Sequence, residues 1–185
     1  MCPEENPKFI VDINVGKLAK WLRMIGYDTQ LFDHRDDKYL IHIAVIANRT
    51  IITRDTQMMQ RRIIAIVELK AVLIKDDDPV KQIYQVIKEL GLNPKFRPFS
   101  LCLECNQSLK KVPKEDARDR VPPYVYQTQS QYVECPNCHR IYWQGTHWQA
   151  MVKKWKIILN SVVVQRFCQC SLIKICPDFP SPGMI

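Results

Sequence analysis

The sequence predicts an α/β fold in which a mostly parallel sheet is flanked by helices and followed by a small second module. Two observations over the first 92 residues support the sheet: short apolar runs rich in β-branched residues alternate with helical patterns, and polar breaks separate them. A third observation is a change of character after a proline-containing linker over residues 93–100, where paired cysteines and many tyrosines appear. We therefore expect one compact domain over residues 8–92.

The first unit of this domain is a strand, an acid and a helix. The apolar run over residues 9–11 is followed by Asp12, and Leu18, Leu22 and Ile25 then recur at helical spacing. Gly26 is placed to end that helix. In open α/β sheets ligands bind at the carboxyl ends of the strands. Asp12 is therefore predicted to lie at a binding edge.

The same alternation continues along the chain to Gly91. We expect further strands over residues 28–32, 50–53 and 71–74, and further helices over residues 38–48, 56–62 and 79–90. The helix over residues 38–48 is so apolar that we expect it to be well buried. Residues 63–70 fit either a strand or a short helix.

Carboxylates follow three of the predicted strands, at Asp12, at Asp55 and within the cluster 76–78. In a parallel sheet these strand ends share one edge, and clustered carboxylates stay ionised together only with a cation between them. Hard oxygen ligands suit Mg²⁺ or Mn²⁺. The alternative for each aspartate is a role in starting a loop or capping a helix, which is common after strands.

The acidic cluster and the second helix leave choices open. Asp78 fits the helix-capping position, which leaves Asp77 or Asp76 for the metal. Asp36 and Asp37 either supply a further ligand from the start of the second helix or only cap it.

Cations accompany the predicted acidic edge. Lys17 and Arg23 fall on the side of the first helix opposite its apolar face, and Arg54 adjoins Asp55. Cations around an acidic centre suit a polyanionic backbone that crosses it, so these three are candidate phosphate contacts. The alternative is a solvated basic surface. The formal net charge of +8 favours a polyanionic partner in the same way.

The chain shows no feature of a secreted or membrane protein. Its N-terminus opens Met-Cys-Pro-Glu-Glu without an apolar core region, and no apolar run approaches the ~18 residues needed to span a bilayer. We therefore expect a soluble cytoplasmic protein, in which cysteines favour metal binding over disulfides.

The most specific local pattern is a pair of Cys-x-x-Cys turns, Cys102/Cys105 and Cys135/Cys138. Four thiolates can surround one tetrahedral Zn²⁺, which predicts a closed structural site in a zinc ribbon over residues 101–150. The alternatives are reduced structural cysteines or a redox pair. Aromatic and basic residues mixed through this module either cover its thin core or stack on bases. Residues 151–185 are then a tail of unknown structure.

Several motifs occurring in one order resemble a known family. They are the stretch VDINVGKLAKWLRMIGYDT over residues 11–29, TRD at 53–55, DDDP at 76–79, the two cysteine pairs, RVPP at 120–123 and RIYWQGTHW at 140–148. Together they are similar to the mut-seven C-terminal RNase domain family, a PIN-like domain with an appended zinc ribbon.

The resemblance implies a PIN-like fold, a divalent-metal site and ribonuclease activity. It implies Asp12 and Asp55 as core catalytic acids, with Asp37 and Asp77 as further members. The leading hypothesis is a metal-dependent ribonuclease in which Asp12, Asp55 and Asp77 hold Mg²⁺ or Mn²⁺ and the ribbon assists RNA binding. The alternatives are a non-catalytic RNA-binding module with structural zinc, and a partner-binding scaffold.

Overall fold

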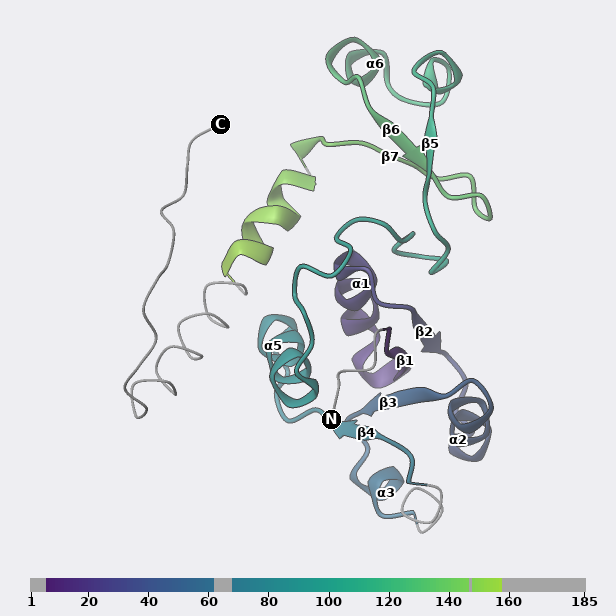
Figure 1. Ribbon diagram of the computed structural model, residues 1–185, viewed down its shortest axis with the longest axis vertical. Coiled ribbons are helices and arrows are strands. Elements are labelled where there is room, and N and C mark those ends of the chain that lie inside the picture. The colour runs from purple at the N-terminus through teal and green to yellow at the C-terminus, as the bar shows by residue number, and fades with distance from the viewer. Residues whose placement is uncertain (1–5, 62–67, 147, 158–185) are drawn as a thin grey trace.

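The fold was examined in a computed structural model, which describes residues 6–61, 68–146 and 148–157. A four-stranded parallel sheet in the order β2-β1-β3-β4 forms its centre (Figure 1). The strands are β1 (Lys8–Asp12), β2 (Thr29–Phe32), β3 (Arg49–Thr53) and β4 (Ala71–Leu73). The predicted parallel α/β architecture is confirmed.

Helices cover both faces of this sheet. A 3₁₀ turn over Ile13–Val15 leads from β1 into α1. The described helices around the sheet are α1 (Gly16–Ile25), α2 (Asp37–Ile46), α3 (Thr56–Met59) and α5 (Pro79–Leu90). Residues 62–67 lie outside the described residues, so the predicted element over 63–70 is described only from residue 68.

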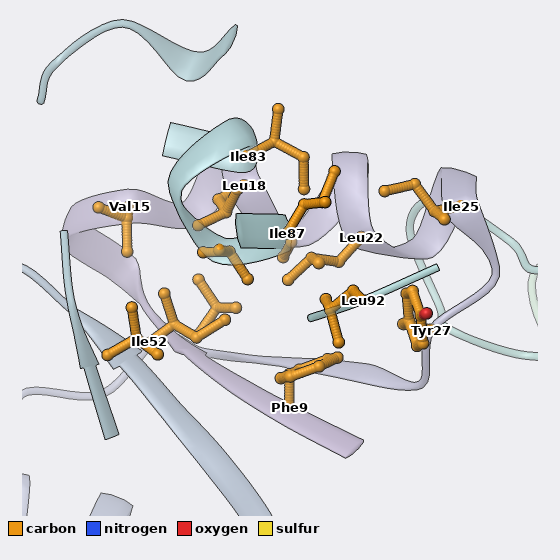
Figure 2. Packing of buried hydrophobic residues seen from close by; sticks show 14 of the residues in the cluster. Phe9, Val15, Leu18, Leu22, Ile25, Tyr27, Ile52, Ile83, Ile87 and Leu92 are labelled. Carbon is orange, nitrogen blue, oxygen red and sulfur yellow. The ribbon is translucent and has the colours of Figure 1, made fainter. Parts of the chain in front are cut away.

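The central strand β1 explains why the sheet needs helices on both sides. Phe9 and Val11 pack into the cluster formed with α1 and α5, whereas Ile10 packs into the cluster formed with α2. Successive side chains of a strand point to opposite faces, so an uninterrupted apolar run is buried on both. Figure 2 shows the larger cluster, in which Leu18, Leu22 and Ile83 meet above the strands.

The helix α2 is less buried than the sequence predicts. Leu40, Ile41 and Ala44 are buried, but Val45 and Ile46 are 43% and 72% exposed. Only one side of this helix meets the sheet, so an apolar composition does not bury the whole of it. The expectation of a well-buried helix over residues 38–48 is therefore wrong for its C-terminal turn.

The end of α1 is fixed by Gly26 and by the chain that crosses it. Gly26 has φ 102°, and a Cβ at this position would lie 2.3 Å from the carbonyl oxygen of Arg97. The amides of Arg97 and Phe99 donate to the carbonyl oxygens of Ile25 and Met24 at 2.9 and 2.7 Å. The linker therefore satisfies carbonyls that the end of α1 leaves without an intrahelical partner.

The second module is a small antiparallel sheet in the order β5-β6-β7. Its elements are β5 (Lys110–Val112), a 3₁₀ turn (Glu115–Ala117), α6 (Pro123–Thr128), β6 (Tyr132–Glu134) and β7 (Ile141–Tyr142). A helix over residues 148–157 follows and returns to the first domain, where Trp155 is buried in the same cluster as Phe9. This helix crosses the predicted boundary at residue 150, and the division into domains stays a prediction.

Within the residues that the structure describes, no helix is both long enough and apolar enough to cross a bilayer.

Candidate functional site

Asp12 lies at the carboxyl end of β1, next to the carboxyl end of β3. The topological switch point of the sheet lies between β1 and β3. From β1 the chain continues to β2 on one side, and it then crosses to β3 and β4 on the other side. Ligands of open α/β sheets bind at such a position. Asp12 is only 8% exposed, and its Oδ2 accepts hydrogen bonds from Thr53 Oγ1 at 2.8 Å and from Asn14 Nδ2 at 2.7 Å.

Asp55 stands two residues beyond Thr53, at the start of α3. Its Oδ1 accepts the backbone amides of Gln57 and Met58 at 2.7 and 3.2 Å, so it caps that helix. Its own amide donates to Thr53 Oγ1 at 3.0 Å. One hydroxyl group therefore connects the Asp12 carboxylate with the backbone of Asp55.

Asp12 and Asp55 share one arrangement of their oxygens. In each, one carboxylate oxygen accepts two hydrogen bonds from the fold, and no donor among the described residues reaches the other. Neither second oxygen is among the described buried polar atoms that lack a partner. Each aspartate thus keeps one oxygen that no described donor reaches, and Mg²⁺ and Mn²⁺ coordinate oxygens of this kind.

Asp37 and Asp77 are instead paired with arginines. Asp37, the first residue of α2, accepts from Arg61 at 2.6 Å. Asp77, in the loop before α5, forms an ion pair with Arg54 and is otherwise exposed. Among the described residues, only four cysteines form a group of three or more metal-binding side chains close enough to share an ion. The four aspartates surround the same edge without forming such a group.

The neighbouring aspartates act as helix caps. Asp36 accepts the amides of Lys38 and Tyr39 at the start of α2, and Asp78 accepts the amide of Val80 at the start of α5. The capping alternative therefore holds for Asp36 and Asp78. Asp76 accepts the amide of Asp78 and pairs with Lys81, and these contacts lower the pKa of its carboxyl group.

The predicted cations have different environments. Lys17 and Arg54 are exposed beside the acidic edge. Arg23 is buried, and its guanidinium donates to the carbonyl oxygens of Thr29, Leu103 and Glu104 at 2.7–2.9 Å. Burial lowers the pKa of Arg23. The expectation that Arg23 lies on an exposed helix face is wrong, because the second module covers that face.

The four predicted cysteines come together as a candidate metal centre. Their four Sγ atoms all lie within 4.8 Å of one another, and the residues are Cys102, Cys105, Cys135 and Cys138. The Sγ atoms of Cys102 and Cys138 are 3.8 Å apart. A tetrahedral Zn²⁺ with Zn–S bonds of ~2.3 Å requires sulfur separations of about 3.8 Å. The residues present therefore fit this ion.

The two Cys-x-x-Cys turns have the same backbone structure. The amide of Cys102 donates to the Gln107 carbonyl, and the amide of Cys135 donates to the Arg140 carbonyl. Asn106 and His139 follow each second cysteine with φ of 62° and 56°. Burial raises the pKa of the Cys102 thiol, but hydrogen bonds from Tyr142 and from the amides of Cys105 and Glu104 lower it to about 7. Such a thiol readily supplies the thiolate that a metal needs.

The first of these turns is attached to the parallel sheet. Asn106 accepts the amide of Thr29 at 2.9 Å and donates to Asp28 at 2.6 Å. Arg49 from β3 also donates to Asp28, at 2.8 Å. Together with the bonds of Arg23, these contacts fix the cysteine module against the C-terminal half of α1 and the start of β2.

Sequence reasoning missed Thr53 and Asn14. Both bind the Asp12 carboxylate, and Asn14 Oδ1 also accepts the amide of Arg54 at 3.3 Å. The available signal was a polar residue ending an otherwise apolar strand at Thr53, and a second polar residue two positions after Asp12.

Comparisons with known proteins bear on the whole arrangement. No curated protein and no solved structure matches the chain. A family model described as the Mut7-C RNAse domain matches residues 7–155, which include both the acidic edge and the four cysteines. The chain therefore belongs to the Mut7-C RNAse domain family.

Proposed function

We propose that the protein is a metal-dependent ribonuclease that hydrolyses RNA phosphodiester bonds at the acidic edge. The observation that carries the proposal is the shared arrangement of Asp12 and Asp55 at the carboxyl end of the sheet, where each keeps one oxygen that no described donor reaches. Membership of an RNAse domain family supports RNA as the substrate.

Asp12 and Asp55 would hold a divalent ion, Mg²⁺ or Mn²⁺, between β1 and β3. When bound, such an ion neutralises phosphate charge and lowers the pKa of its water. Thr53 and Asn14 fix the orientation of Asp12, and Asp55 is fixed by its helix cap. The chain offers no side-chain nucleophile in this proposal, so its residues bind, orient and neutralise.

Arg54 and Lys17 would contact the RNA backbone beside this edge. Arg54 is ion-paired with Asp77, so a phosphate that attracts the guanidinium also releases the Asp77 carboxylate. Asp77 would then add a third carboxylate to the site. Asp37 is ion-paired with Arg61 at the start of α2, so a phosphate that attracts Arg61 would release the Asp37 carboxylate in the same way.

The four cysteines would hold one structural Zn²⁺. The sulfur positions fit a tetrahedral site whose four positions are all filled by the protein, which leaves none for substrate. The ion would stabilise the module that Arg23 and Asn106 attach to the sheet. Assistance to RNA binding follows if that module presents an RNA-binding surface.

The test is cleavage of a labelled single-stranded RNA with Mg²⁺ or Mn²⁺ by the full chain. Asp12→Asn should abolish cleavage because it removes the charge of a ligand while keeping its shape. Asp119→Asn is the matched control, since Asp119 is exposed in the second module. Titration calorimetry with Mn²⁺ should show weaker binding in Asp12→Asn than in this control.

The ribonuclease proposal would be rejected by two results together. The protein would bind RNA without cleaving it in any preparation, and Asp12→Asn and Asp119→Asn would bind Mn²⁺ with equal affinity. That outcome would favour the alternative of a non-catalytic RNA-binding module.

A further inference from the structure

A pocket of about 520 Å³ lies where the cysteine module, the linker and the helix over residues 148–157 meet. Its apolar wall consists of side chains from all three parts: Phe99, Leu103, Tyr142, Trp143, Trp148 and Met151. The volume is within the range of small-molecule sites. The proposed catalytic edge makes no use of this pocket, because none of its aspartates lines it.

The wall is unusually rich in flat rings. Phe99 and Trp148 lie with ring centroids 5.2 Å apart, and Tyr142 and Trp143 are consecutive residues at the end of β7. All four are only partly buried, and all four line the pocket. Proteins that bind unpaired nucleic acid stack bases on such side chains, and stacking accepts any base.

Polar groups border the rings. Gln131, Arg140, Gln144 and Thr146 line the pocket and are exposed. Amide, hydroxyl and guanidinium groups can pair with the edges of a base. Arg140 lies 3.3 Å from Glu104, which also lines the pocket, so part of its charge is already balanced.

An exposed lysine, Lys111, lies on the same face of the small sheet as the pocket. Lys111 is paired with Val133, and Val133 with Tyr142, across the three strands. Residues directly opposite in an antiparallel sheet point to the same face, so Lys111 stands on the pocket face, one strand spacing of about 5 Å from Val133. The charge of Lys111 complements a phosphate backbone.

The pocket is built on the candidate metal centre. The Tyr142 hydroxyl lies 3.1 Å from Cys102 Sγ. A Cβ at Gly145 would lie 2.6 Å from the indole Nε1 of Trp143, so glycine leaves room for that ring. The rings are therefore positioned before any ligand arrives, which reduces the entropic cost of binding.

We propose that this pocket binds an unpaired nucleobase of the RNA strand, which makes single-stranded RNA the substrate class. The proposal rests on the proposed function for the identity of the polymer. It assigns the second module a direct part in RNA binding, through stacking on Trp143 and its neighbours and through phosphate contact by Lys111.

The test measures affinity without cleavage. The full chain with zinc bound carries Asp12→Asn, no Mg²⁺ is added, and binding of a labelled short oligoadenylate is followed by fluorescence anisotropy. Trp143→Leu should weaken binding by about 5- to 100-fold, the effect of losing one stacked base. Tyr124→Leu is the matched control, because Tyr124 is 74% exposed on α6 and does not line the pocket.

A second measurement does not depend on the folding of that variant. Oligoadenylate added to the protein with Trp143 unchanged should quench indole fluorescence. An abasic oligonucleotide of equal length should not quench it. Gln144→Ala, an exposed change, should also weaken binding of the base-bearing strand alone.

Equal affinity for abasic and base-bearing strands, or undiminished affinity in Trp143→Leu, would overturn the pocket proposal while leaving cleavage by the unmodified protein intact. Loss of self-association in Trp143→Leu with unchanged RNA affinity would assign the pocket to protein contact and overturn it as well. Absence of cleavage combined with Trp143-dependent binding would reject the ribonuclease and keep the pocket.

Discussion

Thr53 donates a hydrogen bond of 2.8 Å to Asp12 from the neighbouring parallel strand. The same hydroxyl accepts the amide of Asp55 at 3.0 Å. It therefore fixes two aspartates that lie more than forty residues apart in the sequence. Outer groups of this kind orient the ligands of a metal site.

Thr53→Val removes this hydroxyl and keeps the shape of the side chain. We expect cleavage to fall about 10- to 100-fold, as it does when the partner of a ligand is lost. Stability should fall by about 1–3 kcal/mol, because the Asp12 carboxylate and the Asp55 amide lose a partner. Steady-state kinetics and urea unfolding measure the two effects. Thr53→Ser should restore both, and an equally inactive serine variant would contradict the hydrogen-bond role.

Arg54→Gln tests phosphate contact at the acidic edge. RNA affinity should fall, and the slope of log K against log salt should decrease by about 1, because one fewer counterion is released. Arg118→Gln serves as a control, since Arg118 is exposed in the second module and does not line its pocket. An unchanged slope in Arg54→Gln would contradict phosphate contact by Arg54 and leave only its ion pair with Asp77.

Arg23→Met tests the attachment of the second module. The substitution leaves the carbonyls of Thr29, Leu103 and Glu104 without their donor, so we expect a loss of about 2–4 kcal/mol in urea unfolding. Lys20→Met on the same helix removes only an exposed ion pair with Glu104 and should cost less than about 1 kcal/mol. Similar losses in the two variants would show that Arg23 acts as a surface residue.

Zinc content tests the four-cysteine site. The purified full chain should contain about one zinc ion per molecule, the number that four thiolates hold. Cys138→Ser should lower this content and destabilise the second module, because metal binding contributes folding free energy. Metal analysis and thermal unfolding with and without a chelator measure both. A stable, zinc-free protein would reject the structural site.

Asp28 predicts a pH dependence. Burial by itself would raise the pKa of Asp28, but hydrogen bonds from Arg49 and Asn106 outweigh it and hold the pKa below the ordinary value of 3.8. The folded state then favours the carboxylate, so its contribution is complete above pH 3.8 and declines as pH falls below it. The difference in unfolding free energy between wild type and Asp28→Asn should shrink as the pH falls below 3.8. A constant difference would contradict the ionised pairing.

The sequence was sufficient for the features that depend on local pattern. The strand, acid and helix from Lys8 to Gly26 follow from side-chain spacing and a terminal glycine, and the cysteine pairs follow from metal chemistry. Parallel pairing then places the carboxyl ends of β1 and β3 at one edge, whereas the register that sets Thr53 beside Asp12 was not predicted.

Features that depend on distant parts of the chain were not accessible in this way. Arg23 occupies the polar side of its helix and is buried only because residues 103 and 104 arrive there. The pairing of Asp77 with Arg54 and of Asp37 with Arg61 depends on how separate loops approach. Spacing within one helix or strand contains no signal for such contacts.

Trp155 gives the cysteine module a second anchor. The chain leaves the first domain along the linker that crosses Gly26, and it returns when Trp155 enters the core containing Phe9. A module held at both ends cannot swing away from its neighbour. The acidic edge lies at one end of α1 and the cysteine turn at the other, so ten helical residues, about 15 Å, separate them. Under the proposed function, an RNA strand that reached both would be cut at a fixed number of nucleotides from the base bound in the pocket.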